Sequence, residues 1–141
     1  MEELTFFYKL AEINQAATQL IYQAAMAKIW LFVGDMGAGK TTLIKSISET
    51  LGASGEFSSP TYSLANEYRL SANKKIFHLD LYRLRSFDEA MDIGIEDYLF
   101  GGDYCFVEWP QLIMPLLKKG EFITIQIESI SAIERKITIF M

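Results

Sequence analysis

The residues best suited to chemistry in this sequence lie between Gly34 and Thr42. They read Gly-Asp-Met-Gly-Ala-Gly-Lys-Thr-Thr and match the spacing G-x-x-x-x-G-K-[ST] of a phosphate-binding P-loop. In such a loop the glycines let backbone N–H groups approach phosphate oxygens, and the following helix adds unpaired donors and the positive end of its dipole. Lys40 is expected to contact the β- and γ-phosphates, and Thr41 is expected to place its hydroxyl on Mg²⁺.

The segments on either side of this loop have the character that a P-loop requires. Ile29–Val33 is a short apolar run typical of a buried strand, and residues 42–51 carry apolar side chains at helical spacing. This order of strand, loop and helix argues against a glycine-rich turn that merely caps a helix. The predicted nucleotide-binding residues of the loop are Asp35, Met36, Gly37, Ala38, Gly39, Lys40, Thr41 and Thr42.

Glu108 is the best candidate for a further metal ligand. It ends the apolar run 104–107, a position where P-loop proteins place an acidic residue near the metal. A carboxylate there can take Mg²⁺ directly or through water, because Mg²⁺ prefers oxygen ligands and keeps several waters. Most P-loop proteins have Asp at this point, so Glu is a mild departure. The alternative is a carboxylate at a strand end that simply faces solvent.

Asp80 is a candidate for handling the attacking water. It alternates with Leu79 and Leu81 along a predicted strand, so its side chain points away from theirs. A carboxylate near the phosphates can hold metal-bound water or position the water that attacks. Two other interpretations stay open, namely a surface charge and an ion-pair partner for Arg83.

Three other side chains are weaker candidates. Thr61 lies in a Ser-Pro-Thr turn between the P-loop helix and the next predicted strand, where nucleotide switches place a threonine that senses the γ-phosphate. Trp109 can stack near the nucleotide or can simply pack. His78 is the only histidine, so it cannot form a zinc site with another histidine, and a structural role is expected for it.

The nucleotide is expected to be ATP. The guanine-selective pattern N-K-x-D begins at Asn73 but has Ile76 where the aspartate is required. One alternative to an ATPase is a small-molecule kinase, which usually needs a lid rich in arginine, and this chain has no arginine cluster beyond Arg83 and Arg85. Another alternative is a regulatory nucleotide-binding module with little hydrolysis.

Composition limits the classes of partner and the compartment. The formal net charge of −5 disfavours tight RNA or DNA binding by the isolated chain. No apolar run approaches the roughly 20 residues of a membrane span, and the acidic start lacks the basic residues of a signal peptide. Cys105 is the only cysteine and lies in an apolar run, which favours an inert buried thiol. We expect a cytoplasmic protein that is monomeric when free.

The remaining segments predict a single α/β domain over residues 1–141. Apolar residues at helical spacing predict a helix from Ile13 to Ala24, and Ser86-Phe87-Asp88-Glu89 is a capping box before a short helix. Besides Ile29–Val33, the predicted strands are 4–8, 62–70, 75–82, 104–107, 121–127 and 134–140. We expect a three-layer P-loop NTPase domain with a mixed, mostly parallel central sheet and antiparallel hairpins at 62–82 and 121–140.

Four segments together resemble the TsaE family, the P-loop ATPases of bacterial tRNA threonylcarbamoyladenosine synthesis. The matching segments are the P-loop at 34–42, Ser-Pro-Thr-Tyr at 59–62, His-Leu-Asp-Leu-Tyr-Arg-Leu at 78–84 and Val-Glu-Trp-Pro at 107–110. The P-loop is generic, whereas its combination with Asp-Leu-Tyr-Arg and Glu-Trp-Pro is specific. Met36 replaces a usual Leu, Gln111 stands where Glu is common, and the match is weak after Ile127.

The resemblance implies a Mg²⁺–ATP site and a role within an assembly. The implied metal ligands are Thr41, Glu108 and Asp80, the implied catalytic residues are Lys40, Asp80 and Thr61, and Trp109 joins the nucleotide-binding set. The implied partner is a TsaD–TsaB-type complex, which transfers the threonylcarbamoyl group to adenosine 37 of tRNA. The ATPase would meet tRNA only through that complex, hydrolyse ATP slowly alone, and use hydrolysis to reset the complex.

Overall fold

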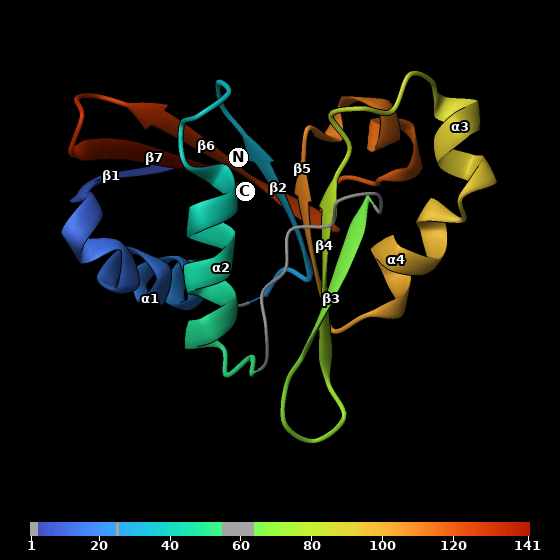
Figure 1. The fold of residues 1–141 in the computed structure, drawn as a ribbon, viewed down its shortest axis with the longest axis horizontal. Helices are drawn as coiled ribbons and strands as arrows, with labels where there is room; N and C mark the ends of the chain where they lie inside the picture. The colour runs from blue at the N-terminus through green and yellow to red at the C-terminus, as the bar shows by residue number, and fades with distance from the viewer. Residues whose placement is uncertain (1–2, 25, 55–63) are drawn as a thin grey trace.

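The computed structural model describes residues 3–24, 26–54 and 64–141, which fold into a mixed α/β layer structure (Figure 1). The strands are β1 (Glu3–Lys9), β2 (Ile29–Val33), β3 (Ala65–Arg69), β4 (Lys75–Asp80), β5 (Tyr104–Glu108), β6 (Phe122–Ser129) and β7 (Glu134–Phe140). The helices are α1 (Ile13–Gln23), α2 (Lys40–Thr50), α3 (Phe87–Asp92) and α4 (Ile95–Gly101), with 3₁₀ turns η1 (Leu10–Glu12) and η2 (Pro110–Leu116). None of these helices is long and apolar enough to cross a membrane.

Within the described residues, the strands form one sheet in the order β1-β7-β6-β2-β5-β4-β3. The four strands β6, β2, β5 and β4 pair in parallel, and the outer pairs β1–β7, β7–β6 and β4–β3 are antiparallel. The predicted mixed sheet with two antiparallel hairpins is therefore confirmed, with parallel pairing confined to the central strands. The parallel strands bring their carboxyl ends to the edge of the sheet where α2 begins.

Helices cover the two faces of this sheet, which gives the predicted three layers (Figure 1). Side chains of β2 alternate between the faces: Trp30 and Phe32 pack with residues of α1 and α2, whereas Ile29 and Leu31 pack with residues of α3, α4 and η2. β2 is buried on both sides, because helices lie on both faces of a parallel sheet. The strand that leads into the P-loop, β2, is thus packed between helices on both faces of the sheet.

Two of the boundaries that differ from the sequence prediction lie next to the predicted site. Helix α2 begins at Lys40 rather than Thr42, directly after Gly39 in the left-handed conformation (φ 105°). Strand β4 ends at Asp80 rather than Tyr82, because the Asp80 Oδ1 accepts the Tyr82 N–H at 3.2 Å and the chain turns there.

The predicted capping box also forms differently. Ser86 Oγ accepts the Glu89 N–H at 3.1 Å, while the Glu89 carboxylate takes the N–H of Arg85 at 3.0 Å.

The register between β4 and β5 determines which side chains meet near α2. His78 lies opposite Phe106, and Asp80 lies opposite Glu108. Residues opposite each other in a ladder share a face of the sheet, and residues two apart in a strand also share it. Since Phe106 packs in the cluster that includes α2, the side chains of His78, Asp80 and Glu108 all belong to the face that α2 covers.

Candidate functional site

The P-loop is shaped by contacts with the strands that close the sheet. Gly34 lies so close to β6 that an added Cβ would be 2.5 Å from the carbonyl oxygen of Ile127. From β7, Arg135 Nε donates to the carbonyl oxygen of Ala38 at 3.0 Å. Gly37 has a φ of 80°, a backbone conformation that side chains with a Cβ rarely adopt. Gly39, with a φ of 105°, is the third glycine on which the loop depends, and Arg135 adds a contact from a distant strand.

Lys40 lies beneath this loop with its ammonium group among oxygen acceptors. Its Nζ donates to the carbonyl oxygen of Gly34 at 2.6 Å and to that of Asp35 at 3.1 Å. The ring centroid of Trp109 lies 4.2 Å from Nζ, a cation–π distance. A phosphate oxygen is a stronger acceptor for an ammonium group than a carbonyl oxygen, because it is charged. The lysine can therefore turn from the loop to a phosphate.

Burial lowers the pKa of Lys40 from its usual 10.5, and nearby carboxylates oppose that shift. The opposing groups are Glu108, Asp80 and Asp35, each of which favours the charged ammonium. A buried charge without partners would be costly. Lys40, which is 5% exposed, is thus a cation held in a site that already contains negative charge.

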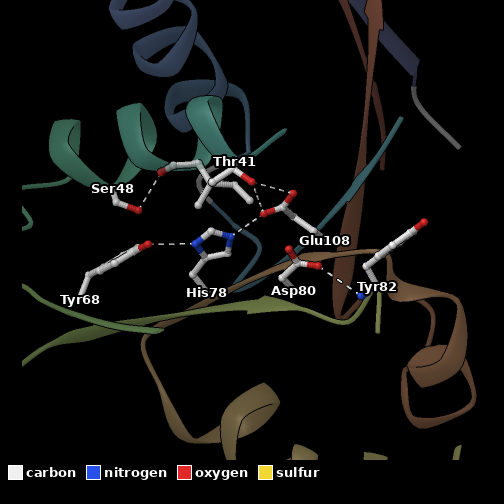
Figure 2. Close-up of polar contacts among 8 residues, drawn as sticks. Thr41, Ser48, Tyr68, His78, Asp80, Tyr82 and Glu108 are labelled. Carbon is white, nitrogen blue, oxygen red and sulfur yellow. Dashed lines mark hydrogen bonds and ion pairs between the residues drawn. The ribbon is translucent and has the colours of Figure 1, made fainter. Parts of the chain in front are cut away.

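Thr41 and Glu108, two of the predicted metal ligands, lie in contact with each other (Figure 2). The Thr41 hydroxyl lies 2.8 Å from Oε2 and 3.0 Å from Oε1 of Glu108. Thr41 belongs to the first turn of α2, and Glu108 is the last residue of β5. Mg²⁺ bound with a nucleotide takes one or two protein oxygens and fills the rest of its shell with phosphate and water. A hydroxyl and a carboxylate in contact at the end of the P-loop fit that requirement.

Asp80 lies beside Glu108 and at the end of β4 (Figure 2). It forms no ion pair with Arg83 in the part of the chain that the structure describes, so that interpretation is not supported. Asp80 is partly exposed, and it is one of the carboxylates that oppose the lowering of the Lys40 pKa. Asp80 can thus face both a phosphate bound by Lys40 and the water around it.

His78 connects Glu108 to the outer hairpin. Its Nε2 lies 2.7 Å from Glu108 Oε2, and its Nδ1 lies 2.9 Å from the hydroxyl of Tyr68 on β3 (Figure 2). All three side chains are buried. Thr41, Glu108, His78 and Tyr68 therefore form a continuous row of polar contacts from α2 across β5 and β4 to β3.

Comparison with known proteins identifies the family. The sequence model of the family described as "Threonylcarbamoyl adenosine biosynthesis protein TsaE" matches residues 7–137. The chain belongs to the TsaE family. The TsaE of Bacillus subtilis is 36% identical over 135 residues, which cover 92% of this chain and 83% of that protein. The TsaE of Synechocystis is 37% identical over 82% of this chain and 77% of that protein.

Two further matches differ in how much of the relative they cover. The TsaE of Haemophilus influenzae is 40% identical over 90 residues, which is 64% of this chain and 56% of that protein. A solved structure titled "Crystal structure of Bacillus subtilus YdiB" superposes with a TM-score of 0.71 and 28% sequence identity, over 98% of this chain and 84% of that chain. The fold of this TsaE chain is therefore similar to a solved fold over nearly all of its length.

The structure brings most of the predicted TsaE site residues to one place. Five of them lie around the start of α2, namely Lys40, Thr41, Asp80, Glu108 and Trp109. The loop residues 35–39 lie directly before this helix. Trp109 has a left-handed backbone (φ 57°), and its ring lies 5.0 Å from that of Tyr82. Thr61 lies outside the described residues, so its predicted role stays a prediction.

Sequence reasoning missed three side chains of this site. A structural role was expected for His78, but its direct contact with Glu108 was not predicted. Its position two residues before Asp80 on the same strand face was the available signal. Tyr68 and Arg135 carried no comparable signal, because their contacts depend on strands that are far apart in the sequence.

Proposed function

We propose that this TsaE chain binds and hydrolyses Mg²⁺–ATP in support of threonylcarbamoyladenosine formation at adenosine 37 of tRNA, as the accessory ATPase of a TsaD–TsaB-type complex. The role in tRNA modification rests on membership of a family named for that biosynthesis. The ATPase role rests on one observation above all. The Thr41 hydroxyl contacts both carboxylate oxygens of Glu108, and the residue before Thr41 is the buried Lys40 of the P-loop.

Each side chain has a defined task in this proposal. Lys40 would exchange its carbonyl partners in the loop for phosphate oxygens, and Thr41 and Glu108 would hold Mg²⁺. Bound Mg²⁺ would supply positive charge against the charge that develops on the phosphate oxygens. Asp80 would accept a hydrogen bond from the attacking water and fix its position.

The free chain is expected to turn over slowly. Lys40 is covered by Trp109 and bound to the loop carbonyls of Gly34 and Asp35, so a nucleotide has to displace these contacts before it can react. The negative net charge also favours tRNA contact through partner proteins rather than directly. Both features support a role inside an assembly, with the transfer of the threonylcarbamoyl group on another subunit.

An ATPase assay with and without a TsaD–TsaB pair and tRNA tests the proposal. We expect slow phosphate release by the free chain and faster release in the presence of the pair. Phosphate transfer only when a hydroxyl acceptor is supplied would instead indicate a kinase. Turnover that stays negligible in every mixture, with nucleotide binding intact, would indicate a regulatory binding module.

Glu108→Ala tests the metal site within the same assay. We expect it to weaken ATP binding in the presence of Mg²⁺ more than binding in EDTA, because the carboxylate acts through the metal. Glu96→Ala is the matched control, since Glu96 is an exposed carboxylate on the opposite layer of the domain. An equal loss of binding with and without Mg²⁺ would reject the metal role of Glu108.

A further inference from the structure

We propose that His78 is a positioning residue that fixes the carboxylate of Glu108 for Mg²⁺. This inference rests on the proposed Mg²⁺–ATP site and assigns a residue that the P-loop motif does not include. The hydrogen-bonding partners of the His78 ring are Glu108 and Tyr68. It acts by holding one oxygen of Glu108, so that the other oxygen and the Thr41 hydroxyl face the metal.

The contact between His78 and Glu108 is short and buried. His78 Nε2 and Glu108 Oε2 are 2.7 Å apart, and the two residues are 4% and 3% exposed. Hydrogen bonds to an ionised group are stronger than neutral ones, and low local dielectric strengthens them further. Both side chains are almost fully buried, so solvent competes little for this contact. The contact therefore has the strength required to orient a side chain.

The polarity of the contact follows from the chemistry of a carboxylate. A carboxylate that binds a metal is ionised and can only accept hydrogen bonds. His78 Nε2 must therefore carry a hydrogen, whatever the state of the other ring nitrogen. In the neutral ring Nδ1 is then an acceptor, and the Tyr68 hydroxyl at 2.9 Å can donate to it. The Glu108 carboxylate thus selects the tautomer, and the Tyr68 hydroxyl holds the rotation of the ring from its other side.

The two oxygens of Glu108 have different surroundings. Oε2 receives His78 at 2.7 Å and the Thr41 hydroxyl at 2.8 Å, whereas Oε1 contacts Thr41 at 3.0 Å. Oε2 is the anchored oxygen, and Oε1 is the one that can turn to the metal or to its water when Thr41 releases it. Loss of partners that orient metal ligands typically costs about 10- to 100-fold in metal affinity or activity.

Two substitutions of His78 separate this role from packing. The amide of Gln can occupy the position of Nε2 and donate to Glu108, whereas the shorter amide of Asn reaches the position of Nδ1, next to Tyr68. We expect His78→Asn to raise the Mg²⁺ concentration required for half-maximal ATPase activity by about 10- to 100-fold. We expect His78→Gln to retain most of the wild-type Mg²⁺ response, and both variants to bind ATP in EDTA like the wild type.

The single histidine also allows a test in the unmodified chain. ¹⁵N-labelled histidine gives signals from one imidazole only, because His78 is the only histidine in the sequence. We expect the chemical shifts of the wild-type ring to indicate hydrogen on Nε2, and the Nε2 signal to move when Mg²⁺ is added to the ATP-bound chain. ATP in EDTA should leave this signal nearly unchanged, since the carboxylate then has no metal to share.

Each result either supports or overturns the positioning role of His78. Equal effects of the Gln and Asn substitutions on the Mg²⁺ requirement, or a ring with hydrogen on Nδ1 alone, would overturn the positioning role. Should both variants fail to fold, the ring spectrum of the wild-type chain still decides. A wild-type chain that neither binds nor hydrolyses ATP would instead reject the proposed function, which keeps the two failures distinct.

Discussion

The side chains of the candidate site are buried charges and hydrogen-bonding groups that a stable core would exclude. Lys40, His78 and Glu108 are each 5% exposed or less. Burying such groups costs free energy unless they are paired, and each of the three has a partner within hydrogen-bond distance. An apolar replacement would pack as well without that cost. Their presence at one end of the sheet supports the proposal of a charged ligand there.

The lowered pKa of Lys40 predicts a pH dependence of ATP binding. Burial places its pKa below 10.5, so the free protein loses this positive charge at a lower pH than an exposed lysine would. Bound phosphate favours the charged form, and ATP affinity should therefore fall as the pH rises through the lowered pKa. In the absence of nucleotide the sign is opposite for folding. The charged lysine is disfavoured in the folded chain. The free energy of unfolding should therefore rise as the pH increases from the lowered pKa to 10.5, and keep that gain above 10.5.

Titration calorimetry from neutral to alkaline pH measures the effect on ATP binding. Lys40→Arg is the informative variant, because arginine stays charged over this range. It should bind ATP more weakly than the wild type but lose little affinity as the pH rises. The same slope in both proteins would show that another group titrates.

Asp80 is expected to act on turnover rather than on binding. Asp80→Ala removes a carboxylate that favours the charged form of Lys40 but leaves the P-loop contacts in place. We expect the variant to keep ATP affinity within a few-fold and to lose about 100-fold or more in turnover, the usual scale for a positioned acid or base. Single-turnover assays with Asp97→Ala, an exposed carboxylate on α4, provide the control. Normal rates for Asp80→Ala would remove it from the catalytic set.

At the scale of elements, β7 supports the P-loop from outside the motif. Arg135→Ala removes the hydrogen bond from Nε to the Ala38 carbonyl oxygen. We expect ATP affinity to fall about fivefold, which corresponds to the roughly 1 kcal/mol of one such bond. Lys136→Ala is the neighbouring control, because Lys136 pairs with Glu128 instead of the loop. Equal losses of affinity in the two variants would show that Arg135 has no specific effect.

The sequence predicts the elements of the site better than the contacts among them. Ile29–Val33 could be predicted as a strand and Glu108 as the end of another, because their apolar runs are short and bounded. Lys40 and Thr41 follow from the P-loop motif. The contact between His78 and Glu108 could not be predicted, because it depends on β4 lying beside β5 in a particular register. Local patterns carry no information on strand order, which is decided by packing of the whole sheet.

At the scale of the whole molecule, Cys105 reports on opening of the domain. It is 1% exposed, and burial raises the pKa of its thiol to about 12, so it is neither accessible nor a thiolate when the chain is folded. We expect a thiol reagent to react only after unfolding. Saturating Mg²⁺–ATP at about 100 times its dissociation constant should stabilise the fold by about 2.7 kcal/mol and slow the reaction about 100-fold.

Labelling kinetics followed by mass spectrometry measure this effect. The chain unfolded in denaturant gives the unprotected rate, since it contains the same single thiol. Rapid labelling under native conditions would contradict the buried position of Cys105. Protection that ATP does not change would contradict nucleotide binding by the folded domain.

The position of β7 between β1 and β6 has a consequence for synthesis of the chain. The ribosome makes residues 34–42 long before Arg135, and in the described sheet β1 has β7 as its neighbour. A nascent chain can therefore contain the whole P-loop motif while its first strand is unpaired and Ala38 lacks its arginine. Such distant pairings form slowly, because the intervening loop must be closed first. Full nucleotide affinity should thus be reached only after β7 has left the exit tunnel and paired with β1.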